Sequence, residues 1–309
     1  MMVVEVDPRI SYIFPTHYLP NMIELERIST LDHPELRPYR TLRRAVEHIN
    51  QGIFIAEGEK VVRRFLESDL AVVSLLLTEE WFQRFEGILS ARKEGHIEVF
   101  IGDKRLLETI VGFQLHQGIM AVGKVPGPYP LTDIIMKKPS SHFLVAVESI
   151  ANSENLGVIV RNCVAFGVDG LLVGETSSSP YLRRAVRMSM GTVFRLPVIH
   201  VQNLASTLRK LAEDHGMGTI AAHPHPEGLS ANAVDYSGSI CLVFGSEGSG
   251  ISPEVLQSCQ QTVAIPMTVG TDSLNVASAS AILLYEARRL GKSTPQSGRA
   301  YNSLGEHRT

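Results

Sequence analysis

The sequence predicts a protein of the α/β class with two domains, and three observations lead to this prediction. The chain has 309 residues, which is enough for about two domains. Apolar runs alternate with amphipathic segments along most of its length, a pattern typical of mainly parallel sheets covered by helices. In the second half the predicted strands are continuous apolar runs, as expected when helices cover both faces of a parallel sheet.

The first part of the chain predicts a smaller N-terminal α/β domain over residues 37–125. Its expected helices lie at 41–51, 59–68, 79–95 and 103–112. Its expected strands are the short apolar runs 52–58, 72–78, 97–102 and 118–125. Residues 1–36 carry only a weak pattern, so we predict an irregular N-terminal extension.

Residues 126–141 are rich in proline and glycine, which predicts a linker between the two domains. Alternation resumes in a second domain over 142–290. We expect its strands at 142–150, 169–174, 193–199, 218–223, 239–245 and 261–267. We expect its helices at 154–166, 180–190, 202–215, 252–259 and 275–290, the second-last being short. The polar tail 291–309 has no periodicity and is predicted to be disordered.

Composition and charge exclude several classes of protein. No run of 18 or more apolar residues occurs, so no membrane span is predicted. The N-terminus lacks the basic start of a secretory signal, and we expect a cytoplasmic protein. The net charge of −3 argues against a protein that coats nucleic acid non-specifically. Cys163, Cys241 and Cys259 lie far apart in apolar surroundings, which predicts buried thiols and no metal site.

Three junctions between a predicted strand and a predicted helix carry unusual residues, namely 147–163, 240–252 and 263–289. Such junctions form the ligand-binding edge of an open α/β sheet. In the first, Asn155 lies in the first turn of the expected helix and Arg161 about two turns later. Spacing alone does not decide whether Arg161 is a solvated or salt-bridged side chain or a functional group.

The second junction surrounds Glu247 with Gly245, Gly248 and Gly250. Glycine lets a backbone turn sharply and lets a ligand touch it. The pattern is neither a dinucleotide fingerprint nor a phosphate loop, because the Lys-Ser/Thr ending is missing. An ordinary tight turn would explain the same glycines.

The third junction precedes the last predicted helix. Asp272 or Ser273 is the expected N-cap, since short polar side chains accept hydrogen bonds from the first free amides of a helix. The small residues Ala277, Ser280 and Ala281 then allow something to come close to the start of this helix. Another helix, a loop of the same chain and a ligand are all open alternatives.

The sequence pattern alone does not decide the roles of two further groups of residues. Arg183, Arg184 and Arg187 are either a solvated helix face or a grip for phosphate. His223 and His225 are each followed by proline and have no evident third ligand. For the histidines a surface loop is therefore preferred over a metal pair.

Taken together, the three junctions resemble the motifs of the SpoU/TrmH family of SPOUT-type RNA ribose methyltransferases, over about residues 142–290. The matching residues, in the family's order and spacing, are Asn155, Gly157 and Arg161, then Gly245, Glu247, Gly248 and Gly250, then Ile265, Pro266, Met267, Ser273, Leu274 and Asn275. The N-terminal part resembles, more loosely, the family's small substrate-binding domain. The chain departs from the pattern at Asn162, where threonine is common, and at Ala277, where serine is common.

The resemblance implies a C-terminal domain with a mainly parallel sheet and a deep trefoil knot, working as a homodimer. It implies that S-adenosyl-L-methionine is the cofactor. The residues expected to bind it are Gly245, Gly250, Ile265, Met267 and Leu274.

The resemblance also implies the reaction, which is transfer of a methyl group from a sulfonium to a ribose 2′-hydroxyl of RNA. Arg161 is then the central catalytic residue; because guanidinium stays protonated, we expect it to grip phosphate or to steady the alkoxide. Asn155, Ser273 and Asn275 are expected to orient the hydroxyl and the arginine, and Glu247 to hold its loop or to offset the sulfonium charge.

We expect ribosomal RNA to be the substrate rather than transfer RNA. The arginines at 183, 184 and 187, together with the N-terminal domain, are the expected RNA-binding surface. One alternative is an RNA-binding or ribosome-assembly module without catalysis. Another is a different nucleotide-binding enzyme, against which the missing phosphate-loop signatures argue.

Overall fold

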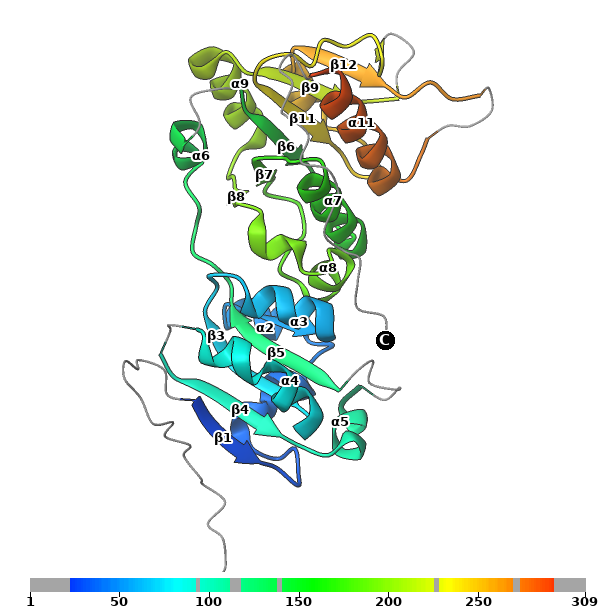
Figure 1. Ribbon diagram of the computed structural model, residues 1–309. Coiled ribbons are helices and arrows are strands. Elements are labelled where there is room, and N and C mark those ends of the chain that lie inside the picture. The colour runs from blue at the N-terminus through cyan, green and yellow to red at the C-terminus, as the bar shows by residue number, and fades with distance from the viewer. Residues whose placement is uncertain are drawn as a thin grey trace, which may run out of the picture.

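The computed structural model describes residues 23–92, 95–111, 118–137, 141–224, 228–268 and 273–291 (Figure 1). These residues contain two sheets, one built from residues 23–124 and one from residues 143–264. The α/β class and the division into a smaller N-terminal and a larger C-terminal sheet agree with the sequence prediction. The predicted tail 291–309 lies outside the described residues except for Gly291.

The N-terminal sheet has five strands in the order β1-β4-β3-β5-β2. β1 and β3 run parallel to β4, whereas β5 is antiparallel to both β3 and β2. The strands are β1 (Ile23–Arg27), β2 (Ile53–Glu57), β3 (Val72–Leu77), β4 (Ile97–Ile101) and β5 (Ile119–Lys124). The helices are η1 (Pro34–Leu36), α1 (Arg37–Arg40), α2 (Ala45–Asn50), α3 (Glu59–Leu66), α4 (Glu79–Ser90) and α5 (Lys104–Val111).

The C-terminal sheet has seven strands in the order β10-β12-β9-β11-β6-β7-β8, and every pairing is parallel. The strands are β6 (Phe143–Val147), β7 (Gly170–Val173), β8 (Val198–His200), β9 (Gly218–Ala222), β10 (Leu229–Ser230), β11 (Ile240–Phe244) and β12 (Gln261–Ala264). The helices are α6 (Leu131–Lys137), α7 (Ser153–Ala165), α8 (Arg183–Met188), η2 (Thr192–Arg195), α9 (Leu204–His215), α10 (Pro253–Gln257) and α11 (Val276–Leu290).

Helices cover both faces of the C-terminal sheet, which explains why its strands are apolar throughout. One apolar cluster joins the sheet to α6, α9 and α10, and another joins it to α7 and α11. The central strands β6 and β11 are buried at every position. Gly216 ends α9 in the left-handed conformation with φ 59°, as the sequence predicts for a glycine that follows a helix.

Four parts of the chain differ from the prediction. Residues 1–36 are not irregular throughout, because β1 forms the edge of the N-terminal sheet. The linker 126–141 contains α6, whose Ile134 is buried in the core. Residues 193–199 are not one strand, since η2 occupies their first half and β8 begins only after Pro197. The two-residue strand β10 was not predicted.

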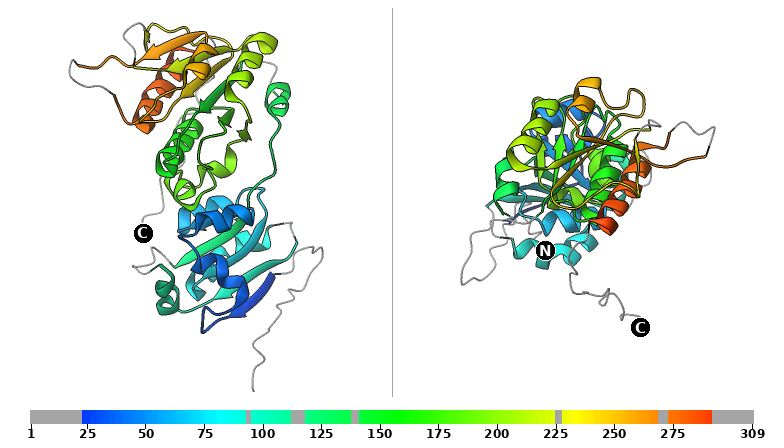
Figure 2. Two further views of the ribbon diagram at one scale, coloured as in Figure 1. Left: turned by 180° about the vertical axis from the view of Figure 1, so that it is seen from behind. Right: turned by 90° about the horizontal axis from the view of Figure 1, so that it is seen from above.

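The two domains are stacked end to end, with α3, α8 and η2 at their junction (Figures 1 and 2). A single apolar cluster runs through the junction, from the N-terminal sheet to α7 and α11. Phe194 of η2 packs against both Phe54 and Phe65, with its ring centroid 5.1 Å and 5.3 Å from theirs. The Arg64 guanidinium also donates to the Met190 carbonyl at 2.7 Å. These contacts join the domains as one packed body.

Candidate functional site

The three junctions singled out in the sequence meet at the carboxyl edge of the C-terminal sheet. They follow β6, β11 and β12, and β6 and β11 are direct neighbours in the sheet. Parallel strands bring their carboxyl ends to one edge, so loops that lie about a hundred residues apart in sequence become adjacent in space.

A cavity of about 320 Å³ lies between the loop after β11 and the segment before α11. All five residues predicted to bind the cofactor line it, namely Gly245, Gly250, Ile265, Met267 and Leu274. Glu247 and Ser273, from the predicted catalytic set, also contribute to its wall. The rest of the wall includes apolar side chains of Phe244, Val263, Val276 and Leu283.

The glycines after β11 are required by the geometry of the loop. A Cβ on Gly245 would overlap the backbone of Gly250 and Ile251, so only glycine allows the two ends of the loop to approach. Ser246 and Gly250 exchange backbone hydrogen bonds of 3.1 Å and 3.0 Å across this turn. Gly250 has φ 68°, which favours glycine. The backbone of the loop therefore forms part of the cavity wall.

Three predicted catalytic residues form one hydrogen-bonded group at the rim. The Asn155 amide donates to Glu247 Oε1 at 2.9 Å, and the Asn275 amide donates to the same oxygen. Asn275 also donates to Asn155 Oδ1 at 3.2 Å. The group ties the start of α7, the loop after β11 and the start of α11 to one another. Among the described residues, Glu247 Oε2 has no recorded partner.

Asn275 also caps α11, because its Oδ1 accepts from the amides of Ala277 and Ser278. The predicted cap was therefore wrong for Ser273, and Asp272 lies outside the described residues. One amide side chain serves both tasks, since its oxygen faces the helix and its nitrogen faces Glu247. Asn152 caps α7 in the same way, accepting from Glu154 and Asn155.

The small residues at the start of α11 meet both another helix and the cavity. The Asn162 amide of α7 donates to the Ala277 carbonyl at 3.0 Å and to the Ser280 hydroxyl at 2.9 Å. On another side of α11, Val276 and Ala279 line the cavity. Asn162 therefore holds α7 and α11 together at a position where the chain departs from the family's usual residue.

Arg161 lies on α7 with an exposed side chain and does not line the cavity. It lies six positions after Asn155, which corresponds to about 9 Å along the helix axis. Within the described part of the chain no hydrogen bond or ion pair of Arg161 is recorded. Gly157, the other residue of this motif, is a packing residue: a Cβ there would lie 2.5 Å from the Ala185 carbonyl oxygen of α8.

The three predicted RNA-binding arginines have different surroundings. Arg183 makes an ion pair of 2.6 Å with Glu57 of the N-terminal domain, and both side chains are largely buried. Arg184 lies 3.7 Å from Glu154 and is exposed. Arg187 is exposed, with no ion pair recorded in the described ranges. Arg183 is thus engaged between the domains, and the other two remain open to solvent.

Sequence reasoning missed the part of the cavity wall that follows β9. Ala222, His223 and Pro224 line the cavity, although the histidine was assigned to a surface loop. The signal was available, because β9 is one more parallel strand whose carboxyl end reaches the same edge. His225 lies outside the described residues.

The described residues contain no group of three or more His, Cys, Asp or Glu side chains placed to hold a metal ion. Cys163 and Cys241 are buried, and Cys259 is partly buried. Burial raises the pKa of the Cys259 thiol to about 12, which disfavours the thiolate that metals bind. No helix in the described ranges combines the length and the apolar character needed to cross a bilayer.

Comparisons with known proteins identify the family. Residues 142–285 match the SpoU rRNA Methylase family, and residues 55–128 match a family described as RNA 2′-O ribose methyltransferase substrate binding. An uncharacterized tRNA/rRNA methyltransferase of Mycobacterium tuberculosis is 30% identical, covering 88% of this chain and 94% of its own length. The 23S rRNA (guanosine-2′-O-)-methyltransferase RlmB of Acinetobacter baylyi is 29% identical, covering 68% of this chain and 86% of its own length.

Solved structures of the same kind have the same fold. The AdoMet-bound rRNA methyltransferase of Sinorhizobium meliloti superimposes with a TM-score of 0.72 at 26% identity. The match covers 86% of this chain and 98% of that one.

The fold and the cavity at the sheet edge define an α/β RNA methyltransferase with an attached substrate-binding domain. The chain belongs to the SpoU rRNA methylase family, as the resemblance of its three motifs implies.

Proposed function

We propose that this protein transfers a methyl group from S-adenosylmethionine to a ribose 2′-hydroxyl of ribosomal RNA. The observation that carries the proposal is the single cavity shared by Gly245, Ile265 and Leu274, with Glu247 at its rim. The relative RlmB of Acinetobacter baylyi, which this chain matches over 86% of its length, is a 23S rRNA methyltransferase, which favours ribosomal over transfer RNA. A pure RNA-binding module would have no use for this cavity.

The cavity fits S-adenosylmethionine in size and in chemistry. Its volume of about 320 Å³ lies within the range of small-molecule sites. Gly245, Gly248 and Gly250 in this loop have no side chains that could cover the backbone, which suits hydrogen bonds to an adenine or an amino-acid end. Ile265, Val276 and Leu283 offer an apolar wall. The cofactor supplies an electrophilic methyl group on a positive sulfonium when it is bound.

The polar group at the rim positions the reactants. Glu247 accepts from both Asn155 and Asn275 through Oε1, which fixes the loop after β11 against two helix starts. Its second carboxylate oxygen is available to offset positive charge at the cavity mouth. Ser273 lines the cavity beside this group and can orient a hydroxyl that enters it.

Arg161 has the role of holding RNA rather than of taking a proton, because guanidinium stays protonated in proteins. Its exposed position leaves all its donors open to a phosphate, or to an alkoxide that develops on the ribose. Since it stands about two turns from Asn155, an RNA strand that meets both residues runs along α7 from its first turn to Arg161. Arg184 and Arg187 on α8 extend the same positive surface.

The active form is proposed to be a homodimer with a trefoil knot in the C-terminal domain. Three exposed apolar side chains of α11 support the dimer, namely Ile282, Tyr285 and Leu290. The Tyr285 ring, 53% exposed, packs on Phe166 with its outer face uncovered by the described chain. The knot remains a prediction from the family resemblance.

The test is methyl transfer by Arg161→Ala. With labelled cofactor and total RNA, followed by mapping of the modified ribose, we expect transfer to fall by 100-fold or more, since each lost contact to developing charge is worth ~3 kcal/mol. Cofactor affinity measured by calorimetry should stay within about twofold, because Arg161 does not line the cavity. Lys210→Ala removes one exposed cation from α9 and is the control. Full activity of Arg161→Ala, or label found only in transfer RNA, would contradict the proposal.

A further inference from the structure

A second, larger cavity lies in the N-terminal domain, at the carboxyl ends of β1, β4 and β3. Its volume is about 670 Å³. Its lining residues are Arg27, Ile28, Thr78, Glu79, Glu80, Trp81, Ile101, Gly102, Asp103, Lys104 and Gly118. It occupies the edge of the sheet at which α/β domains bind ligands, and the helices α4 and α5 both start there. Nothing in the methyl-transfer site accounts for it.

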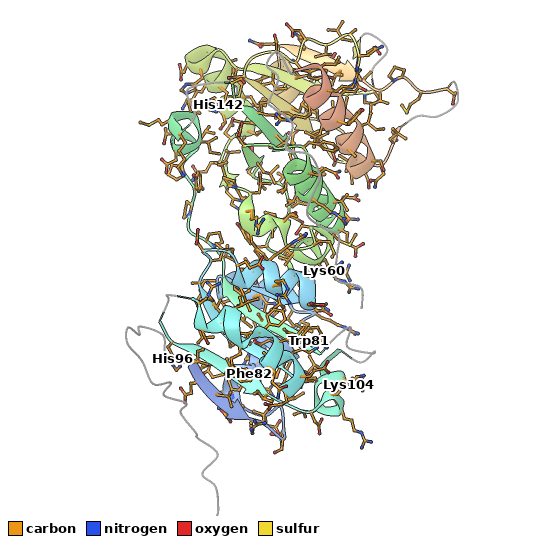
Figure 3. The ribbon with its side chains drawn as sticks, viewed as in Figure 1. Lys60, Trp81, Phe82, His96, Lys104 and His142 are labelled. Atoms are coloured by element: carbon orange, nitrogen blue, oxygen red, sulfur yellow. The ribbon has the colours of Figure 1, made fainter. Side chains whose placement is uncertain are left out.

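The cavity contains the one tryptophan of the chain, Trp81. Its ring is partly buried, with Phe85 packed edge-on at 5.9 Å. The Arg84 guanidinium lies 4.9 Å from the ring centroid. An aromatic ring held in this way is a platform on which a base of single-stranded RNA can stack. Figure 3 shows Trp81 and Lys104 on the same flank of the domain.

The charges of the lining favour a base edge over a phosphate as the occupant. Three carboxylates face two cations, and Glu79 is already paired with Arg27 at 2.5 Å and Glu80 with Arg84 at 2.7 Å. Asp103 differs, because the only recorded contact of its carboxylate in the described chain is a hydrogen bond from the Leu106 amide to Oδ1 at 2.6 Å. Its Oδ2 and the remaining lone pairs are free to accept, and they can accept only from donors.

Among RNA bases, guanine presents two adjacent donors, N1–H and N2–H, on one edge. A carboxylate can accept both at once, in the paired geometry that it also uses for arginine. Uracil offers a single ring donor, and adenine and cytosine offer one amino group each. Lys104, whose side chain is 77% exposed and whose Nζ lies 4.0 Å from Glu108 Oε1, is placed to meet the phosphate of the same nucleotide.

We propose that this cavity holds one unpaired guanine of the RNA substrate, stacked on Trp81 and hydrogen-bonded to Asp103. The proposal rests on the chain's being an RNA methyltransferase. It adds a base-reading site in the N-terminal domain, whereas the cofactor cavity lies in the C-terminal domain.

Because Trp81 is the only tryptophan, its fluorescence reports on this cavity in the full-length protein. We would titrate the protein with uridine heptamers whose central nucleotide is guanosine, adenosine, cytidine or uridine. The guanosine heptamer should quench the fluorescence saturably and bind at least about fivefold more tightly than the all-uridine heptamer, as for one paired base contact. Equal quenching by all four heptamers, or quenching by none, would overturn the proposal.

Asp103→Asn separates base reading from folding. Asparagine retains an oxygen that can cap α5 but replaces the double acceptor, so the ratio of guanosine to uridine affinity should fall to about one. Asp214→Asn, on the exposed end of α9, removes the same charge and should leave the ratio unchanged. Trp81→Phe, followed by fluorescence anisotropy of labelled RNA, should weaken the guanosine heptamer more than the uridine one. An unchanged ratio in Asp103→Asn contradicts the proposal.

The outcome is independent of the methyl-transfer site. Calorimetry with S-adenosylmethionine and labelled methyl transfer on the same preparations show whether that site is intact. If the protein methylates RNA but shows no guanosine preference, only the proposal that the cavity binds guanine is refuted. If the protein shows the preference but neither binds the cofactor nor transfers methyl, only the proposed methyl-transfer function is refuted.

Discussion

Replacing Asn275 with aspartate tests whether the contact with Glu247 holds the cofactor cavity together. Aspartate is as good an N-cap as asparagine, so the start of α11 should be preserved. The change removes the donor to Glu247 and places a second carboxylate against it. The variant therefore keeps the cap and removes both donations of the Asn275 amide, to Glu247 and to Asn155.

The magnitude follows from two terms. Losing a hydrogen bond to a charged acceptor costs about 1.5 kcal/mol, the lower end of the usual range. Two unit charges about 3 Å apart repel by about 1.4 kcal/mol in water, the appropriate medium because this rim is exposed. The sum of about 3 kcal/mol corresponds to an affinity loss of about 100-fold if the loop must close on the cofactor. We expect a loss of about 10- to 100-fold, since solvent relaxes part of the repulsion.

The assay is calorimetric binding of S-adenosylmethionine between pH 8 and pH 5.5. Like charge raises the pKa of a carboxylate pair, so the folded variant takes up a proton as the pH falls. The repulsion is then relieved, and Asn275→Asp should regain part of its affinity at the acidic end. Ser278→Asp adds the same charge one turn further along α11, without contact to Glu247, and should bind normally at both pH values. Wild-type affinity of Asn275→Asp at pH 8 would refute the reasoning.

Three further outcomes follow from the packing. Gly157→Ala should lower the free energy of unfolding by about 1–3 kcal/mol, because its Cβ meets the Ala185 carbonyl, whereas Gly87→Ala in open space on α4 should not. Phe194→Ala should cost about 3–5 kcal/mol and separate the unfolding of the two domains in calorimetry; a single unchanged transition would contradict the shared core. Tyr285→Glu should shift the mass measured by light scattering from dimer to monomer, and an unchanged mass would remove α11 from the proposed interface.

The sequence predicts most of the elements well, because local signals decide them, whereas the cavity residues were predicted from the resemblance of their motifs to a known family. Apolar runs that end in glycine or polar residues mark the strand ends, and parallel topology then brings those ends together. The strand β1 was not predicted, because its sequence Ile-Glu-Leu-Glu-Arg is not an apolar run. An edge strand can carry such polar residues. Pro197 interrupts what otherwise reads as one strand from Val193 to Ile199.

Contacts over long sequence separations could not be predicted from pattern. Asp272, Ser273 and Asn275 are equally good caps by type, and only the position of Glu247 in space selects Asn275. Arg183 reads as an RNA contact until the fold places Glu57, 126 residues earlier in the chain, against it. The first pair depends on how the loop after β11 meets α11, and the second on how the two domains dock, and no local propensity encodes either.

The docking of the domains has a consequence for the substrate. One apolar core passes through the junction, and Arg64 and Arg183 lock its rim with contacts of 2.7 Å and 2.6 Å. The cofactor cavity and the cavity at Trp81 therefore hold a fixed separation, with most of α7 and the whole junction between them. An RNA that reaches both must present two sites at matching distance, which a folded RNA does and a short flexible strand does only at a large cost in conformational entropy. With the guanine site that we propose, selection of the methylated ribose would rest on RNA shape as well as on a single base.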